Sequence, residues 1–141
     1  MAEINTLLNY ILTLLPQIFE GLKVTIELFI LTLILSIPLG IIVALGRLSK
    51  IKVINKLTSF YVLIMRGTPL LLQIVFIFFG LPSLNIVIDR FPAAIIAFTL
   101  NYAAYFGEIF RAGISSVDIG QYEASHVLGL SKKDTFFRII L

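Results

Sequence analysis

The chain has 141 residues, of which 59% are hydrophobic and 13% are charged, and its formal net charge is +3 at pH 7. A soluble domain of this length cannot bury that much apolar surface in one core, so the composition predicts a membrane protein and excludes an ordinary soluble domain. The sequence has no cysteine and a single histidine, His126. This excludes disulfides, thiol nucleophiles and metal sites built from clustered histidine or cysteine.

The first residues carry apolar side chains at helical spacing, with polar residues between them: Ile4, Leu7, Leu8, Ile11, Leu12 and Leu15. This pattern predicts an amphipathic helix that lies at the membrane interface and ends near Pro16. A cleaved signal peptide is the alternative. Glu3 and the lack of any Lys or Arg before Lys23 argue against it, because a signal peptide begins with a positively charged region.

Three longer apolar segments predict membrane-spanning helices at about residues 22–46, 58–82 and 92–112, within one membrane domain that covers residues 1–141. Residues 28–46 contain no charged side chain, and a crossing needs about 20 apolar residues. The third segment begins after Pro92, which suits the first turn of a helix. Small residues along this segment predict close helix packing: Ala93, Ala94, Ala97, Ala103, Ala104 and Gly107.

The second segment contains an arginine in its apolar sequence, FYVLIMRGTPLLLQIVFIFFGLP. Along a continuous helix at about 1.5 Å per residue, Arg66 lies roughly 22 Å from Leu81, in a hydrocarbon core of about 30 Å. An arginine that snorkels at a helix end and a functional arginine are equally open interpretations. Gly67 and Pro69 predict a local break or kink beside it.

The third segment carries polar residues of its own. For Asn101, in the middle of the segment, we favour a hydrogen bond to a neighbouring helix over contact with a solute. Glu108 and Arg111 are three residues apart and therefore share a helix face. An ion pair near the membrane interface is the default interpretation of these two residues.

Positive charges are distributed unevenly between the loops. They concentrate between the first two segments and after the third, at Arg47, Lys50, Lys52, Lys56, Arg111, Lys132, Lys133 and Arg138. The loop between the second and third segments holds only Asp89 and Arg90. The positive-inside rule therefore predicts that the N-terminus and the Asp89 loop lie outside and that the C-terminal region lies in the cytoplasm.

A short polar stretch, GQYEASHVLGL, interrupts the apolar sequence near the end of the chain. Asp118 and Gln121 have capping-box spacing and Gly129 suits a left-handed C-cap, so a helix is expected at about residues 118–129. Ser131 and Asp134 have the same spacing and open a further helix. A helix of about ten residues is marginal in water unless it packs on something. Its own bundle and a separate cytoplasmic protein are both open as the packing surface.

This stretch also carries a resemblance. The sequence EASHVLGLSKKDTFFRIIL resembles the EAA loop of permease subunits of ATP-binding-cassette importers, which has a Glu-Ala-Ala start, a glycine after three residues and a later Ile-x-Leu-Pro stretch. Glu123, Ala124 and Gly129 match, and Ser125 replaces the second alanine. The stretches RGTPLLLQIVFIFFGLP (66–82) and NYAAYFGEIFRAGISSVDIGQYEA (101–124) are similar to the polar-amino-acid branch of the family. The resemblance covers nearly the whole chain.

The resemblance implies an all-α integral membrane permease fold: an interfacial helix, three membrane-spanning helices, a cytoplasmic coupling helix and the start of another helix. It implies that the coupling helix docks on a separate ATPase subunit, which holds ATP and Mg while this chain binds no cofactor. The expected contact residues are Gln121, Glu123, Ala124, Ser125, Gly129 and Leu130. Candidates for the translocation path or for helix packing are Arg66, Gln73, Asn101 and Glu108.

The implied function is import of polar amino acids across the cell membrane by alternating access. The implied partners are a second copy or a related permease, and an extracytoplasmic solute-binding protein. Family members continue past the Ile-x-Leu-Pro stretch, so we expect the chain to correspond to the front part of a permease, about three of five spans. A non-transporting membrane scaffold and an inactive truncated permease are the alternatives. An intramembrane enzyme is disfavoured because no nucleophile, base and orienting group converge.

Overall fold

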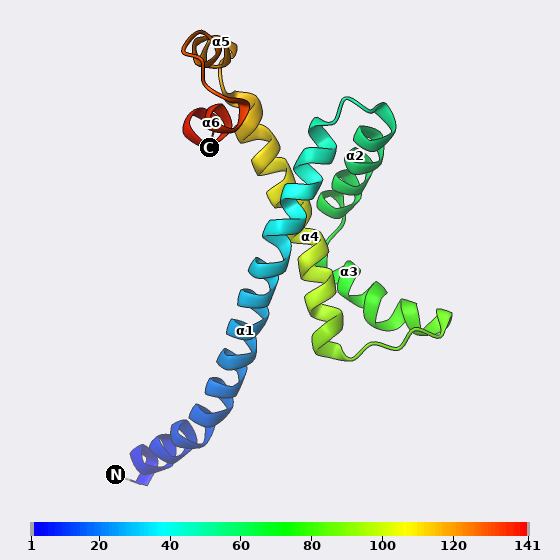
Figure 1. Ribbon diagram of the computed structural model, residues 1–141. Helices are drawn as coiled ribbons and strands as arrows, with labels where there is room; N and C mark the ends of the chain where they lie inside the picture. The colour runs from blue at the N-terminus through cyan, green and yellow to red at the C-terminus, as the bar shows by residue number, and fades with distance from the viewer. Residues whose placement is uncertain (1, 141) are drawn as a thin grey trace.

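The computed structural model describes residues 2–140, which contain helices and no strand (Figure 1). In chain order the elements are α1 (Ala2–Leu48), α2 (Lys52–Gly67), α3 (Leu70–Val75), a π-helical turn (Phe76–Gly80), a 3₁₀ turn (Leu81–Leu84), α4 (Arg90–Ser116), α5 (Ile119–Val127), α6 (Lys132–Thr135) and a final π-helical turn (Phe136–Ile140). The helical architecture predicted from composition is confirmed. Figure 1 shows α5 and α6 beyond one end of α4, far from the N-terminus.

The first helix is longer than expected, because it runs through Pro16 without ending. The prediction of a separate interfacial helix ending near Pro16 is therefore corrected: its residues form the N-terminal part of α1. Pro16 lacks an N–H donor and its ring crowds the carbonyl four residues before it, so it can bend α1 there, but the leucine- and isoleucine-rich turns on both sides continue the helix. With 47 residues, α1 is about 70 Å long, roughly twice the thickness of a hydrocarbon core. Its first turns are inclined to the rest of the helix (Figure 1).

The core lies where α1 crosses α4, and it is made of small residues as predicted. Ala103, Ala104 and Gly107 of α4 are buried. A Cβ atom placed on Gly107 would lie 2.5 Å from Cγ1 of Val43 and 3.3 Å from the carbonyl oxygen of Gly40. The two backbones approach this closely because no side chain stands between them, which is how helices gain packing energy in lipid.

The second predicted span is broken. Helices α2 and α3 meet at 105° across a break of two residues, so the expected single helix over 58–82 is corrected to two segments. Pro69 has no N–H donor and forces the preceding Thr68 into an extended conformation, with φ −111° and ψ 144°. The depth of Arg66 counted along one continuous helix therefore does not apply.

Within residues 2–140, two helices, α1 and α4, are long and apolar enough to cross a membrane. The bent pair formed by Lys52–Gly67 and Leu70–Leu84 raises the number to three if it counts as one span. The third predicted span, 92–112, corresponds to α4, which extends it at both ends. Pro92 lies in the first turn of α4, and Asp89 occupies the N-cap position. Near the start of α4, Ala93 and Ala97 pack with Ile77 from the turn that follows α3. The fold thus places α2 and α3 against the two halves of one long helix.

Candidate functional site

The short helix α5 begins and ends at caps encoded in its own sequence. The carboxylate of Asp118 accepts a hydrogen bond from the N–H of Gly120 at 2.7 Å. At the other end Gly129 has φ +70°, and the N–H groups of Gly129 and Leu130 donate to the carbonyls of His126 and Ser125, both at 3.0 Å. These two bonds form a Schellman motif. The predicted helix and both cap positions are confirmed, although Asp118 binds Gly120 rather than Gln121.

The side chain of Ser125 joins α5 to the next helix. It is only 3% exposed, and its hydroxyl accepts a hydrogen bond from the hydroxyl of Thr135 at 3.1 Å. Ser131 caps that next helix, as predicted, by accepting the N–H of Asp134 at 3.1 Å. The expectation that Ser125 contributes to an external contact surface is corrected, because the side chain faces α6 and lies inside the chain.

The rest of α5 presents an unusually apolar surface for a helix that projects beyond the bundle (Figure 1). Ile119 is 75% exposed, Val127 86% and Leu128 75%. Four of the six residues predicted to meet a partner are also exposed, namely Gln121, Glu123, Ala124 and Gly129, whereas Leu130 is half-buried. Large apolar side chains grouped beside a carboxylate on an exposed helix are typical of a docking surface.

Glu108 and Arg47 together link three helices near the same end of the bundle. One carboxylate oxygen accepts a hydrogen bond from Nε of Arg111 at 2.8 Å, as the sequence spacing predicted. The other accepts one from Nε of Arg47 on α1 at 3.4 Å. Arg47 also donates to the hydroxyl of Ser59 on α2. Sequence analysis missed the role of Arg47, which lies 61 positions before Glu108, and the only signal was a positive charge at the end of an apolar segment.

Arg66 lies in a hollow beside this charged cluster. Its guanidinium carbon is 5.2 Å from the centre of the Tyr105 ring, at cation–π distance. The hollow is open, has a volume of about 570 Å³ and is lined by Arg47, Ser59, Val62, Leu63, Arg66, Gly67, Tyr105 and Glu108. Arg66 of α2 and Glu108 of α4 therefore line the same hollow. The two residues are far apart in the sequence, so this proximity could not be predicted from it.

Gln73 and Asn101 meet at the α2–α3 break instead. Nδ2 of Asn101 donates to the Met65 carbonyl at 2.7 Å and to Oε1 of Gln73 at 3.2 Å. Nε2 of Gln73 donates to the same carbonyl at 3.1 Å and to the hydroxyl of Thr68 at 2.8 Å. The break leaves the last carbonyls of α2 without helical partners, and these amides supply donors where no water is available. The interhelical hydrogen bond expected of Asn101 is present.

A tyrosine that sequence analysis overlooked adds a second link between α2 and α4. The hydroxyl of Tyr61 donates to the Leu100 carbonyl at 2.5 Å, one residue before Asn101. Tyr61 and Met65 are four residues apart and share the face of α2 that meets α4. A tyrosine hydroxyl on that face was the one sign in the sequence of this hydrogen bond. An apolar cavity of about 360 Å³ lies beside the amide network, and Met65, Thr68, Gln73 and Ala97 are among its lining residues.

The fold and these sites define a class of protein: a multi-pass α-helical membrane protein with a broken second span and a capped helix presented outside the bundle. The family follows from the sequence profile of the binding-protein-dependent transport system inner membrane component, which matches residues 36–141. The chain belongs to this family, and the resemblance noted in the sequence is confirmed.

Curated relatives of the chain include the L-cystine transport system permease protein TcyB of Bacillus subtilis, 45% identical over 126 residues that cover 89% of this chain and 54% of the relative. The arginine transport system permease protein ArtQ of Bacillus subtilis is 43% identical, covering 82% of this chain and 53% of the relative. A putative glutamine transport system permease protein GlnP of Rickettsia prowazekii is 39% identical, covering 89% and 60%. The chain thus spans a little more than half the length of these relatives.

A solved structure has the same fold. The crystal structure of an amino acid ABC transporter superposes with a TM-score of 0.84 at 36% sequence identity, covering 93% of this chain and 61% of the other. The permease fold expected from the resemblance is therefore confirmed.

Proposed function

We propose that the chain forms part of the membrane-spanning permease of an ATP-driven importer of polar amino acids, coupled through α5 to a separate ATPase subunit. The single observation that carries the coupling is the exposed surface of α5, with Ile119, Val127 and Leu128 beside Glu123. The polar-amino-acid substrate class is supported by the names of the relatives, which transport cystine, arginine or glutamine.

The contacts of α5 suggest how force would reach the membrane helices. At one end α5 follows α4 after two residues, and at Ser125 it is hydrogen-bonded to α6. Helix α4 carries Glu108, which is paired with Arg47 of α1. Movement of a partner docked on α5 would therefore shift α4, and with it α1 and α2. A partner that binds α5 differently in two permease states would bias alternating access.

The remaining parts of the proposal follow from this role. ATP and Mg belong to the ATPase, and this chain holds no cofactor and hydrolyses nothing. The N-terminus lies outside and α5 lies in the cytoplasm of a cell whose outer-facing solute-binding protein delivers the amino acid. A second copy or a related permease completes the path. Gln73 and Asn101 hold the α2–α3 break, whereas Arg66 and Glu108 face an open hollow and stay candidates for the path.

The docking role is tested by charge reversal on the exposed face of α5. We expect Glu123→Arg to leave folding intact, because the side chain is exposed, and to remove the ATPase that copurifies after gentle extraction from the native membrane. Glu20→Arg, at another exposed position on α1, is the matched control and should retain the ATPase. Full ATPase binding by Glu123→Arg would refute docking through α5. If no ATPase accompanies even the unmodified protein, the scaffold alternative is favoured.

A further inference from the structure

The loop between α1 and α2 carries positive charge that nothing in the described chain neutralises. No Asp or Glu occurs anywhere in residues 28–88. Lys50, Lys52 and Lys56 are exposed, and none of them takes part in the ion pairs of residues 2–140, which involve Lys23, Arg47, Arg111 and Arg138. Lys52 and Lys56 are four residues apart on α2, where like charges repel one another, so a bound anion would offset this repulsion.

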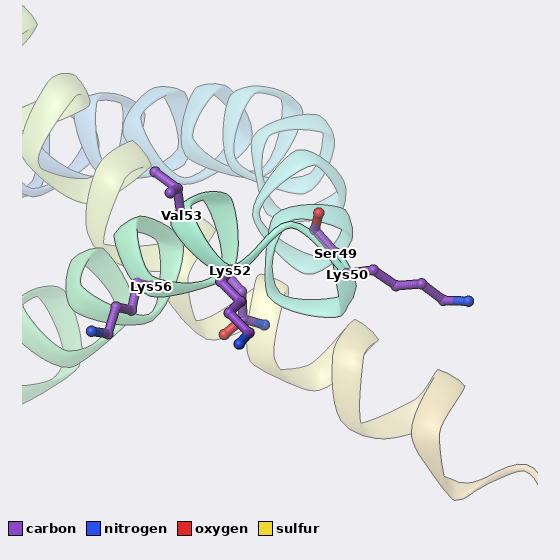
Figure 2. Close-up of a pocket in the computed structure, with 6 residues that line it drawn as sticks. Ser49, Lys50, Lys52, Val53 and Lys56 are labelled. Carbon is purple, nitrogen blue, oxygen red and sulfur yellow. The ribbon is translucent and has the colours of Figure 1, made fainter.

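These lysines border a shallow, open hollow. The lysine hollow has a volume of about 440 Å³ and is lined by Ser49, Lys50, Lys52, Val53, Asn55 and Lys56. Figure 2 shows that Lys52 and Lys56 extend from the same side of α2, whereas Lys50 projects away from them. The amide of Asn55 donates to the carbonyl of Arg47, which fixes one wall of the hollow against the end of α1. Its volume lies in the range of about 300–1,000 Å³ that is common for small-ligand sites.

The start of α2 adds to the positive potential at this place. Ile51 occupies the N-cap position and has no side chain that caps the helix. The first N–H groups of α2 therefore keep their partial positive charge next to Lys52. This helix end alone would not define a site, but it reinforces the charge of the two lysine side chains.

Apolar side chains adjoin the lysine hollow. Ile51, Val53 and Leu57 are exposed large apolar residues on the same first turns of α2. An exposed apolar group next to Lys52 and Lys56 is stable where the hydrocarbon of a membrane meets its headgroups. This combination of charged and apolar side chains suits a position near the phospholipid phosphates.

We propose that the lysine hollow binds the phosphate headgroup of an anionic phospholipid, whose acyl chains cover Ile51, Val53 and Leu57. Free phosphate shares the headgroup chemistry, but it leaves the adjoining apolar side chains uncovered. Near an anionic membrane surface each lysine is worth about 1 kcal/mol, which is about a fivefold change in binding. Loss of both Lys52 and Lys56 is thus expected to weaken binding about 25-fold. The proposal does not depend on the transport function.

The test is a titration of the purified protein in detergent with phosphatidylglycerol and, separately, with phosphatidylcholine, read by native mass spectrometry of the bound lipid. The double variant Lys52→Gln/Lys56→Gln removes two charges from the hollow. The matched control Lys132→Gln/Lys133→Gln removes two exposed charges from α6. Lys52→Arg/Lys56→Arg keeps the charge, and inorganic phosphate at increasing concentration serves as the competitor without acyl chains. Far-ultraviolet circular dichroism verifies that each variant is folded.

We expect the unmodified protein to prefer phosphatidylglycerol over phosphatidylcholine, and the glutamine variant to bind phosphatidylglycerol about 25-fold more weakly. The arginine variant and the α6 control should keep the affinity of the unmodified protein, and inorganic phosphate should not displace the bound lipid. Binding should also weaken as salt is raised, because exposed charges are screened within about 10 Å at 0.1 M. Three results would overturn the proposal: an unchanged preference in the glutamine variant, an equal loss in the α6 control, or displacement of the lipid by low concentrations of phosphate.

Discussion

The crossing of α1 and α4 depends on the missing side chain of Gly107, and adding one methyl group there tests how the fold is held together. In Gly107→Ala the new Cβ would lie 2.5 Å from Cγ1 and 2.8 Å from Cβ of Val43. Separations below 3.0 Å require a neighbouring atom to shift, and Cβ of Val43 cannot shift without its backbone. The matched control is Gly113→Ala on the same helix, where a new Cβ meets no atom within 4 Å.

The two substitutions share the effect on helix propensity and differ in the steric contact. Replacing glycine by alanine inside a helix contributes about 1 kcal/mol through helix propensity, and this contribution is the same at both positions. Forcing an extra carbon into a packed contact costs about 1–3 kcal/mol. We therefore expect the free energy of unfolding of Gly107→Ala to lie about 1–3 kcal/mol below that of Gly113→Ala.

Reversible unfolding by sodium dodecyl sulfate in mixed micelles, followed by far-ultraviolet circular dichroism, measures this difference. Because the chain has no cysteine, single cysteines introduced on α1 and α4 can also report the separation of the helices by cross-linking. Val43→Ala removes the closer of the two contacts and leaves the 2.8 Å one. The double variant should therefore be destabilised by less than the sum of the single changes. Equal stability of Gly107→Ala and Gly113→Ala would refute the close-contact argument.

Asn101→Ala removes the donor that reaches the Met65 carbonyl at 2.7 Å, so we expect a loss of about 1 kcal/mol and faster hydrogen exchange at residues 66–68. The same loss in the exposed control Gln17→Ala would contradict the network. Glu108→Gln leaves two arginines without their shared carboxylate, and we expect a loss of about 1–2 kcal/mol that shrinks in 1 M salt. An effect no larger than that of Glu20→Gln at either salt concentration would show that the ion pairs of Glu108 with Arg47 and Arg111 do not stabilise the fold.

The sequence by itself determined the class of protein and its local features. Its apolar content predicts a membrane protein, and its positive charges distinguish the lysine-rich loop and C-terminal region from the loop at Asp89. The caps of α5 at Asp118 and Gly129 depend on side-chain and backbone chemistry within a few residues. Such short-range interactions form wherever the local sequence permits them, so they can be predicted without knowing the fold. The small residues of α4 likewise predicted close packing, because only small side chains let helices approach in lipid.

The tertiary structure decided how these pieces meet. Pro69 predicted a break, but the 105° angle between the two segments depends on what α3 packs against. The residues on both sides of the break are apolar, so the sequence alone does not show in which direction the chain turns. Pro16 had the opposite outcome, since α1 continues through it with its first turns inclined to the rest of the helix (Figure 1). Glu108 bridges helices whose paired residues are 61 positions apart, and Ser125 turns inward to Thr135. Long-range contacts of this kind are selected by the packing of the whole chain, because each costs chain ordering that only the complete set of contacts offsets.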